Sequence, residues 1–154
     1  MNSLLADFAQ GFPVGQAVPL GERLHVLSLP MKFHPGHVNA YILADDDGLT
    51  IVDTGNGRAD TRAHWQTFLT SDLGRQGVRR VVLTHGHPDH SGHAEWLCQQ
   101  TGAELWATAA EVDAIRRLWR GTPLNYAAVQ AFFRQWGLPA DQFDAVRGLM
   151  DSFR

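Results

Sequence analysis

The sequence predicts a single domain of the α/β (α+β) class, built on a mixed β-sheet with flanking helices and a helical C-terminal segment. Short β-rich apolar segments alternate with segments of helical periodicity over the first two thirds of the chain. Asp45-Asp46-Asp47-Gly48 lies between two of the early apolar segments and is a hairpin signal, so part of the sheet should be antiparallel. The length of 154 residues suits one ordinary domain and is too short for two.

The expected elements follow one another as three strands, a helix, a strand, a helix and a strand. Residues 1–21 show no period and contain several Gly and Pro, which predicts an irregular lead-in. Apolar alternation and β-branched residues predict strands at 23–29, 37–43, 49–53, 79–84 and 104–108. Apolar residues about one turn apart predict helices at 59–73 and 92–100. Residues 109–154 show the same helical spacing, punctuated by Pro and Gly.

Composition excludes several classes of protein. Hydrophobic residues make up 44% of the chain and charged residues 19%, which excludes an intrinsically disordered chain. No apolar run approaches the length of a transmembrane helix, and the N-terminus lacks the basic region of a signal peptide. Cys98 is the single cysteine, which excludes an internal disulfide and fits a reducing compartment. We therefore expect a cytoplasmic protein with no membrane partner, and the net charge of −3 argues against nucleic acid as a partner.

The strongest chemical signal is the segment Thr84-His85-Gly86-His87-Pro88-Asp89-His90, which follows an apolar strand. Imidazole and carboxylate groups suit zinc and other borderline divalent metals. In extended backbone, His85 and His87 point to the same side, about 6.5–7 Å apart at Cα, so both can reach one ion. The adjacent Asp89 and His90 point elsewhere and could hold a second ion beside the first. The sequence therefore predicts a metal site at the end of this strand.

This HxHxDH segment resembles the metal motif of the metallo-β-lactamase fold superfamily. The strand at 37–43, the segment 51–55 and the strand end at 81–84 are similar to the first strands of that family in order and spacing. The resemblance covers roughly residues 22–108. It implies an αββα sandwich of two mixed sheets, of which this chain carries the first half.

The resemblance also implies roles for individual residues. His85 and His87 would bind one divalent ion, and Asp89 and His90 a second. Asp89 would also act as the catalytic residue that contacts the nucleophilic water activated by the ions. Asp53 would lie behind the ligands and orient the metal loop; the alternative is an aspartate that caps Gly55 or Gly57. The expected cofactors are two divalent ions, zinc in the first place, although the ligand types also suit iron or manganese.

Three other parts of the chain have expectations of their own. In the family, the loop that holds His34 and His37 hangs over the metal site, so either residue is a candidate for substrate contact, with a solvated loop as the alternative. His93 is expected at a helix start. The aromatic residues Phe132, Phe133 and Trp136 would form core, or a lid over the pocket, within the segment 109–154.

No histidine follows His93, whereas the family's two sites need further ligands downstream. We therefore expect that the chain is the N-terminal part of a longer protein and is inactive alone. The hypothesis is a metal-dependent hydrolase of a small-molecule ester, lactone, thioester or amide. One alternative is a non-catalytic binding or regulatory domain of the same fold, and a second is a phosphodiesterase or nuclease. The expected partner is the missing C-terminal half, or a second copy in a homo-oligomer that covers the open sheet.

Overall fold

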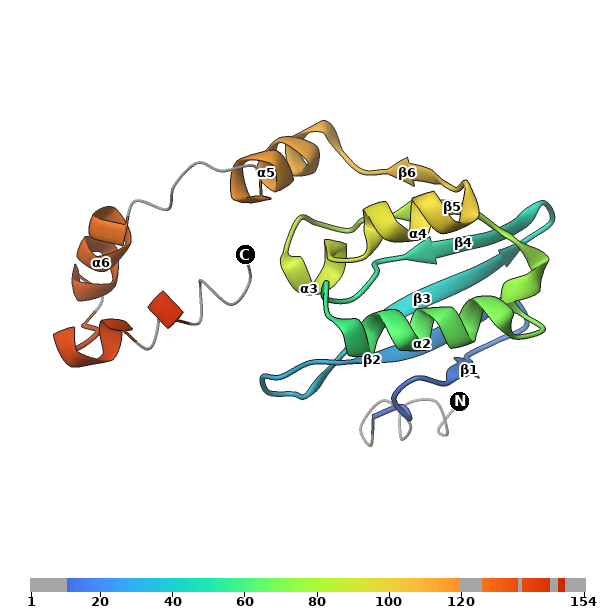
Figure 1. Cartoon of the computed structure of the whole chain (residues 1–154), viewed down its shortest axis with the longest axis horizontal. Helices are drawn as coiled ribbons and strands as arrows, with labels where there is room; N and C mark the ends of the chain where they lie inside the picture. The colour runs from blue at the N-terminus through green and yellow to red at the C-terminus, as the bar shows by residue number, and fades with distance from the viewer. Residues whose placement is uncertain (1–10, 120–125, 136, 145–146, 149–154) are drawn as a thin grey trace. The chain divides into compact units, whose positions relative to one another are not determined.

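The computed structural model describes residues 11–119, 126–135, 137–144 and 147–148 (Figure 1). The chain divides into two compact units, Met1–Val112 and Asp113–Arg154. The first unit contains the sheet and the whole metal motif, and each unit is described by itself.

Six strands form one mixed sheet in the order β1-β2-β3-β4-β5-β6. Their bounds are β1 Ala17–Pro19, β2 Leu24–Pro30, β3 His37–Asp45, β4 Gly48–Val52, β5 Val78–Val82 and β6 Glu104–Trp106. The strands β1 to β4 pair antiparallel, and β3 and β4 are joined by the predicted hairpin, in which Asp45 pairs with Gly48. The β4–β5 and β5–β6 pairs are parallel. The predicted mixed sheet is confirmed.

The helices of the first unit lie in the connections between the parallel strands. They are α2 Ala59–Thr70, the 3₁₀ turn η1 Gly74–Gln76, α3 Pro88–Ser91 and α4 Ala94–Thr101. Figure 1 shows α2 and α4 on the same face of the sheet. The helix predicted at 59–73 ends earlier, at Thr70, because the side chain of Ser71 bonds back to the carbonyl of Phe68 and accepts the amide of Gly74. The helix α4 ends at Gly102, whose φ of +73° is readily adopted only by glycine.

The core lies between these helices and one face of the sheet. Leu27 pairs with Ala40, Ile42 pairs with Ile51, and Ile51 pairs with Val81, so all five side chains share one face. All five are fully buried. From the helix side, Trp65 is also fully buried, and its Nε1 donates to the carbonyl of Thr54 at 2.8 Å. This bond ties the core directly to the loop that follows β4.

The prediction of an irregular lead-in over residues 1–21 is wrong at its end, because Ala17–Pro19 forms β1. Ala17 pairs with Leu27 and Pro19 with His25, antiparallel to β2. The proline is tolerated because β1 is the outermost strand of the sheet. The strand β1 pairs with residues that are ten or fewer positions later in the chain. The turn between β1 and β2 has no periodicity, so the sequence pattern does not reveal this pairing. Residues 1–10 lie outside the described part of the chain.

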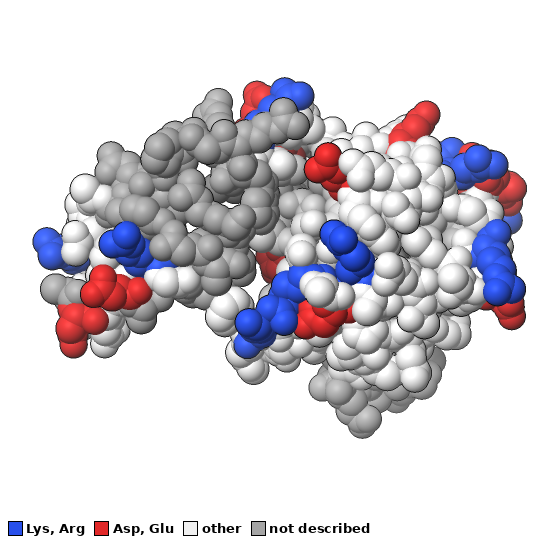
Figure 2. Space-filling view, in the orientation of Figure 1, with Lys and Arg blue, Asp and Glu red and all other residues white. Residues whose placement is uncertain are grey.

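Charged side chains of both signs are interspersed among the described residues on the face shown in Figure 2. Arg80 pairs with Asp47 at 2.7 Å and Arg58 with Asp60 at 2.8 Å. The hydrogen bond from Arg80 holds the pKa of Asp47 below its ordinary value, and the bond from Arg58 does the same for the pKa of Asp60. Several charges on the surface are therefore paired locally.

The helical segments expected after residue 108 are present where the chain is described. They are α5 Ala109–Trp119, α6 Tyr126–Gln135 and the 3₁₀ turn η2 Ala140–Gln142. In α6, Phe132 and Phe133 contact edge to face with centroids 5.6 Å apart, and Phe132 is 56% exposed. Trp136, the third member of the expected aromatic group, lies outside the described residues. None of the described helices is long and apolar enough to cross a bilayer.

Candidate metal centre

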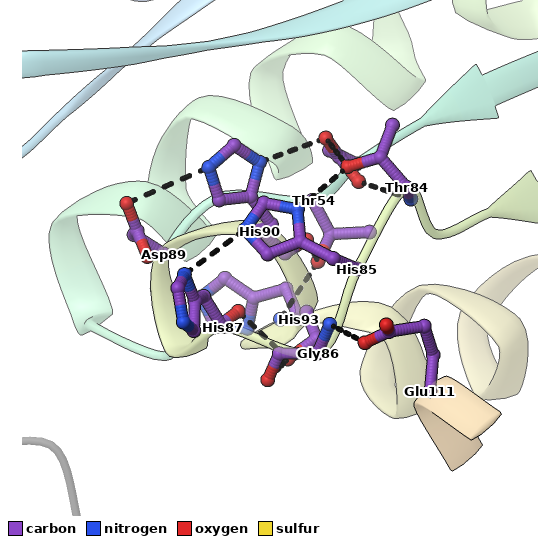
Figure 3. Close-up of polar contacts among 11 residues, drawn as sticks. Thr54, Thr84, His85, Gly86, His87, Asp89, His90, His93 and Glu111 are labelled. Atoms are coloured by element: carbon purple, nitrogen blue, oxygen red, sulfur yellow. Dashed lines mark hydrogen bonds and ion pairs between the residues drawn. The ribbon is translucent and has the colours of Figure 1, made fainter. Parts of the chain in front are cut away.

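The histidine segment lies where two parallel strands end side by side. The segment 84–90 follows β5, and the loop 54–57 follows its parallel neighbour β4. Adjacent parallel strands bring the loops at their carboxyl ends together, which is where α/β proteins place their sites. Figure 3 shows the motif side chains gathered at this point.

His85 and His87 point toward each other, as their spacing predicts. Nε2 of His85 lies 3.0 Å from Nδ1 of His87, and the ring centroids are 4.6 Å apart. Two nitrogens bound to one zinc ion at about 2.0–2.1 Å in tetrahedral geometry are themselves roughly 3.3 Å apart. The observed separation is close to that value, so this pair fits a shared ion.

Asp89 and His90 lie in a helical turn, α3, rather than in the loop expected from the sequence. The turn forms because Pro88 occupies its first position, where the fixed φ of proline suits a helix and no amide is needed. Oδ2 of Asp89 lies 3.6 Å from Nε2 of His90, which is the second donor pair. The rings of His90 and His85 are 4.2 Å apart, so the two pairs are immediate neighbours.

Asp53 connects the two donor pairs, because it bonds directly to His90 and, through Thr84, to His85. Its side chain is nearly buried, with the residue 5% exposed. Oδ1 accepts the amide of Thr84 at 2.9 Å, and Oδ2 accepts the Thr84 hydroxyl at 2.7 Å and lies 2.8 Å from Nδ1 of His90. The carboxylate thus bonds to the metal motif, not to the amides of Gly55 or Gly57 that the alternative interpretation named.

These bonds assign the proton on two of the imidazoles. A carboxylate only accepts, so Nδ1 of His90 carries the hydrogen in its bond to Asp53. The single hydroxyl hydrogen of Thr84 is given to Asp53, so Oγ1 of Thr84 accepts from Nδ1 of His85 at 3.0 Å. When a ring that is protonated on Nδ1 is neutral, its lone pair is on Nε2. The assignment comes from the hydrogen-bond partners. The lone pair on Nε2 of His85 faces Nδ1 of His87 at 3.0 Å, so Nδ1 of His87 carries the hydrogen of that bond and would have to lose it to share an ion with His85.

Asp53 also has an unusual backbone conformation, with a φ of +61°. Aspartate is one of the few residues other than glycine that adopt this left-handed region. Its amide donates to the carbonyl of Val82 at 2.9 Å, which holds the end of β4 against β5. The chain therefore turns at the point where the Asp53 side chain meets Thr84. No pattern in the sequence signals this conformation.

The loop after β4 is bonded to the backbone of α3 along its length. Both the amide and the hydroxyl of Thr54 donate to the carbonyl of His90, at 2.7 and 2.9 Å. The amide of Gly92 donates to the carbonyl of Gly55 at 3.0 Å. A Cβ on Gly92 would contact the amide nitrogen of Gly57, so this close approach requires glycine. The motif is thus held by backbone as well as by Asp53.

His93 lies at the start of α4, as predicted, and is 1% exposed. Its Nε2 lies 2.9 Å from the carbonyl of Arg58, and its amide donates to the hydroxyl of Thr54 at 3.1 Å. Burial lowers its pKa, against the raising effect of the bond to Arg58. A neutral ring that donates to a carbonyl serves packing between α4 and the start of α2.

The two proposed substrate-contact residues lie in and beside one loop, residues 31–36. His34 is exposed and precedes Pro35 through a cis peptide bond, and His37 is the half-buried first residue of β3. No described hydrogen bond or ring contact joins either residue to the metal motif. Cys98, in α4, is half-buried, and burial raises the pKa of its thiol, which disfavours a nucleophilic role.

The donor types and the spacing within each pair suit a divalent cation. Catalytic zinc usually has three protein ligands. Within the described residues, no group of three or more His, Cys, Asp or Glu side chains is arranged around one point. The described part of the chain therefore presents two adjacent pairs of donors rather than a complete three-ligand site.

Comparison with known proteins decides the family. The family model of the metallo-beta-lactamase superfamily matches residues 34–152. The chain belongs to this superfamily. Its structure is similar to a beta-lactamase domain protein from Burkholderia ambifaria, with a TM-score of 0.71, 33% identity, and coverage of 85% of this chain and 42% of that one. It is also similar to a metallo-beta-lactamase family protein from Thermus thermophilus, with a TM-score of 0.63, 28% identity, and coverage of 84% of this chain and 43% of that one.

Two curated relatives match this chain over shorter stretches. An atrochrysone carboxyl ACP thioesterase from Passalora fulva is 37% identical over 65 residues, which are 41% of this chain and 18% of that protein. A probable metallo-hydrolase, YqjP, from Bacillus subtilis is 33% identical over 72 residues, 46% of this chain and 22% of that protein. The chain thus spans about a fifth of these relatives and less than half of the similar structures. The expected metallo-β-lactamase-type fold, incomplete relative to those structures, is confirmed.

Proposed function

We propose that this superfamily member carries the first metal-binding segment of a metal-dependent hydrolase. The observation that supports this most strongly is the 3.0 Å separation between Nε2 of His85 and Nδ1 of His87. Asp53 and Thr84 already direct the lone pair of His85 toward that point. His85 and His87 would hold one ion, and Asp89 and His90 would hold a second.

The ion supplies Lewis-acid activation of water and of the bond to be cleaved. The chain's own residues would hold the ion and orient the imidazole rings that bind it. Asp53 keeps the hydrogen of His90 on Nδ1, and through Thr84 it keeps that of His85 on Nδ1 as well. Asp89, which is partly exposed beside His90, is the proposed acceptor of the water's proton.

The proposed substrate is a small molecule with an ester, thioester, lactone or amide bond. The name of the Passalora fulva relative, a thioesterase, makes a thioester the first substrate to assay. A non-catalytic binding domain is the second candidate. It is favoured by one observation, that the described residues provide donors in pairs and not in threes.

The test is zinc titration of this chain by calorimetry, followed by assays with thioester, lactone, β-lactam and phosphodiester substrates. The double variant His85→Ala/His87→Ala should lose zinc binding, whereas the control His34→Ala, in the exposed loop, should keep it. Equal zinc affinity in the double variant and the wild-type chain would show that the metal assignment is wrong. Because the chain is expected to be inactive alone, the substrate assays are made on protein that also carries the missing C-terminal half. Zinc binding without turnover of any substrate in that protein would favour the binding domain.

A further inference from the structure

A carboxylate outside the histidine motif contacts its centre. Gly86, between His85 and His87, donates its amide hydrogen to Oε2 of Glu111 at 2.6 Å (Figure 3). The carbonyl of Gly86 lies 3.3 Å from the hydroxyl of Ser91, which also bonds to the carbonyl of His87 at 3.0 Å and has a single hydrogen to give. The bond of the Gly86 amide to Glu111 is therefore the main described side-chain contact of the backbone between the two histidines.

Glu111 reaches this position from the first turn of α5. Thr108 precedes the helix, and its hydroxyl accepts the amide of Glu111 at 3.3 Å. The sequence Thr-x-x-Glu at a helix start usually forms a capping box, in which the glutamate bonds back to the amide of the capping residue. Here the described bond of the carboxylate goes instead to Gly86, 25 residues earlier in the chain. The contact lies wholly within the first compact unit.

The geometry of this bond suits a positioning role. An ionised acceptor and a short distance make it stronger than an ordinary backbone hydrogen bond. Glycine adopts a wider range of backbone conformations than any other residue. Without an anchor, the peptide at Gly86 would therefore be the most flexible part of the backbone between His85 and His87. A change in that peptide would move His85 relative to His87, whose nitrogens must stay about 3 Å apart to share an ion.

We propose that Glu111 is a positioning residue that anchors the Gly86 peptide and so sets the separation of the His85 and His87 nitrogens. The inference rests on the proposed function in that these nitrogens bind the metal. The anchoring contact joins a side chain to a backbone amide, so it can be measured in the metal-free chain. The two parts can therefore be tested separately in the same variants.

The experiment uses the whole 154-residue chain in three variants. Glu111→Ala removes the acceptor, and Glu111→Gln removes the charge but keeps an oxygen that can accept the Gly86 amide. Glu95→Ala is the matched control, because Glu95 is also an acid in the first turn of a helix and its described bond is to Gln99 in the same helix. The readouts are amide hydrogen exchange at Gly86 by NMR in the metal-free chain, and the zinc dissociation constant by calorimetry. Circular dichroism verifies that each variant is folded.

In Glu111→Ala, exchange at Gly86 should be faster by at least about tenfold, as expected for loss of a charge-assisted hydrogen bond. Zinc affinity should fall by about 10- to 100-fold, the usual effect of removing a residue that supports metal ligands. Glu111→Gln should recover most of both losses, and Glu95→Ala should change neither. Unchanged exchange at Gly86 in folded Glu111→Ala would overturn the anchoring role.

The zinc readout separates this inference from the proposed function. Faster exchange with unchanged zinc affinity would overturn the link between Glu111 and the ligands while leaving the metal site intact. If the wild-type chain bound no zinc, the proposed function would fail, and the link to metal with it. In that case Gly86 exchange would still decide whether Glu111 anchors the loop.

Discussion

Two loops of the first unit carry histidines that the sequence singles out, and they are held very differently. The loop at 84–90 is bonded through Asp53, Thr54 and Glu111, which come from two separate parts of the chain, the end of β4 and the start of α5. The loop at 31–36 has described backbone bonds mainly within itself, from Met31 to Gly36 and from Gly36 to Phe33. One further bond reaches its edge, from the side chain of Asn56 to the carbonyl of Pro30.

The difference indicates that the loop at 84–90 is the one whose side chains are held in fixed positions. Metal ligands must be held near their final positions before the ion arrives, because ordering them on binding would reduce affinity. Hydrogen bonds from Asp53, directly to His90 and through Thr84 to His85, direct the lone pairs of both rings. The side chain of His34 is exposed and no described hydrogen bond directs its ring, as suits a residue that would contact substrates of varied shape.

The largest expected effect comes from Gly92→Ala, which breaks the close packing behind the metal loop. A Cβ there would collide with backbone atoms of Gly57 and Asn56, which cannot move as a flexible side chain can. Unfolding in urea should show a loss of about 3 kcal/mol, typical of overpacking against rigid structure. The control is Gly21→Ala, an exposed position with no atom within 4 Å of the added Cβ. Equal stability of the two variants would mean that the loops are not packed as described.

Asp53→Asn should have the next largest effect. Asparagine tolerates the positive φ, but its NH₂ group cannot accept from Thr84 or His90, so one bonded group is left without an acceptor. We expect a stability loss of about 2 kcal/mol and zinc affinity weaker by roughly tenfold. Asp72→Asn, at a fully exposed carboxylate, is the control. An equal fall in zinc affinity in both variants would show that Asp53 does not position the proposed metal ligands.

A smaller effect is expected from the pH dependence of His93. Burial lowers its pKa in the folded chain below the value of 6.5 for an exposed histidine. Below pH 6.5 the unfolded state therefore takes up a proton that the folded state resists, so the free energy of unfolding falls as the pH falls. Asp60 and Arg62 act on this ring in opposite directions, Asp60 raising and Arg62 lowering its pKa. Between about pH 7 and pH 5, His93→Gln should lose less stability than the wild-type chain, and an identical loss would show that His93 does not contribute.

His34→Ala should have the smallest effect. The side chain of His34 is exposed and has no described hydrogen bond, so its removal should change stability by about 0.5 kcal/mol or less. Zinc affinity should be unchanged. In protein that also carries the missing C-terminal half, the Michaelis constant for a hydrolysed substrate should rise if the side chain contacts it. Weaker zinc binding in this variant would contradict the contrast drawn between the two loops.

The sequence predicts the features that depend on local pattern. Alternating apolar residues locate the strands from β2 to β6 within a few residues, and the three aspartates before Gly48 locate the hairpin. The spacing of His85 and His87 predicts their convergence. In each case a periodicity or a turn signal lies within a few neighbouring residues, where side-chain alternation and backbone preference decide the structure.

The missed features depend on contacts between distant segments. The positive φ of Asp53 is accompanied by bonds to Thr84 and Val82, about thirty residues later. The sequence around Glu111 predicts an ordinary helix-capping glutamate, and only the structure places its carboxylate on the amide of Gly86. The helical turn α3 was also missed, although it has a local signal. Pro88 is a common first residue of a helix, but residues 84–90 were interpreted only as a segment of metal ligands.

The central claim is that hydrogen bonds within the chain fix the protons of the proposed histidine ligands. The most direct test is the imidazole ¹⁵N NMR spectrum of the metal-free protein at a pH where the rings are neutral, with assignments from His85→Gln and His90→Gln. We predict that His85 and His90 carry their hydrogen on Nδ1, and that added zinc shifts the Nε2 signals of both rings. Signals averaged between the two tautomers, or a hydrogen on Nε2 in either ring, would contradict the account.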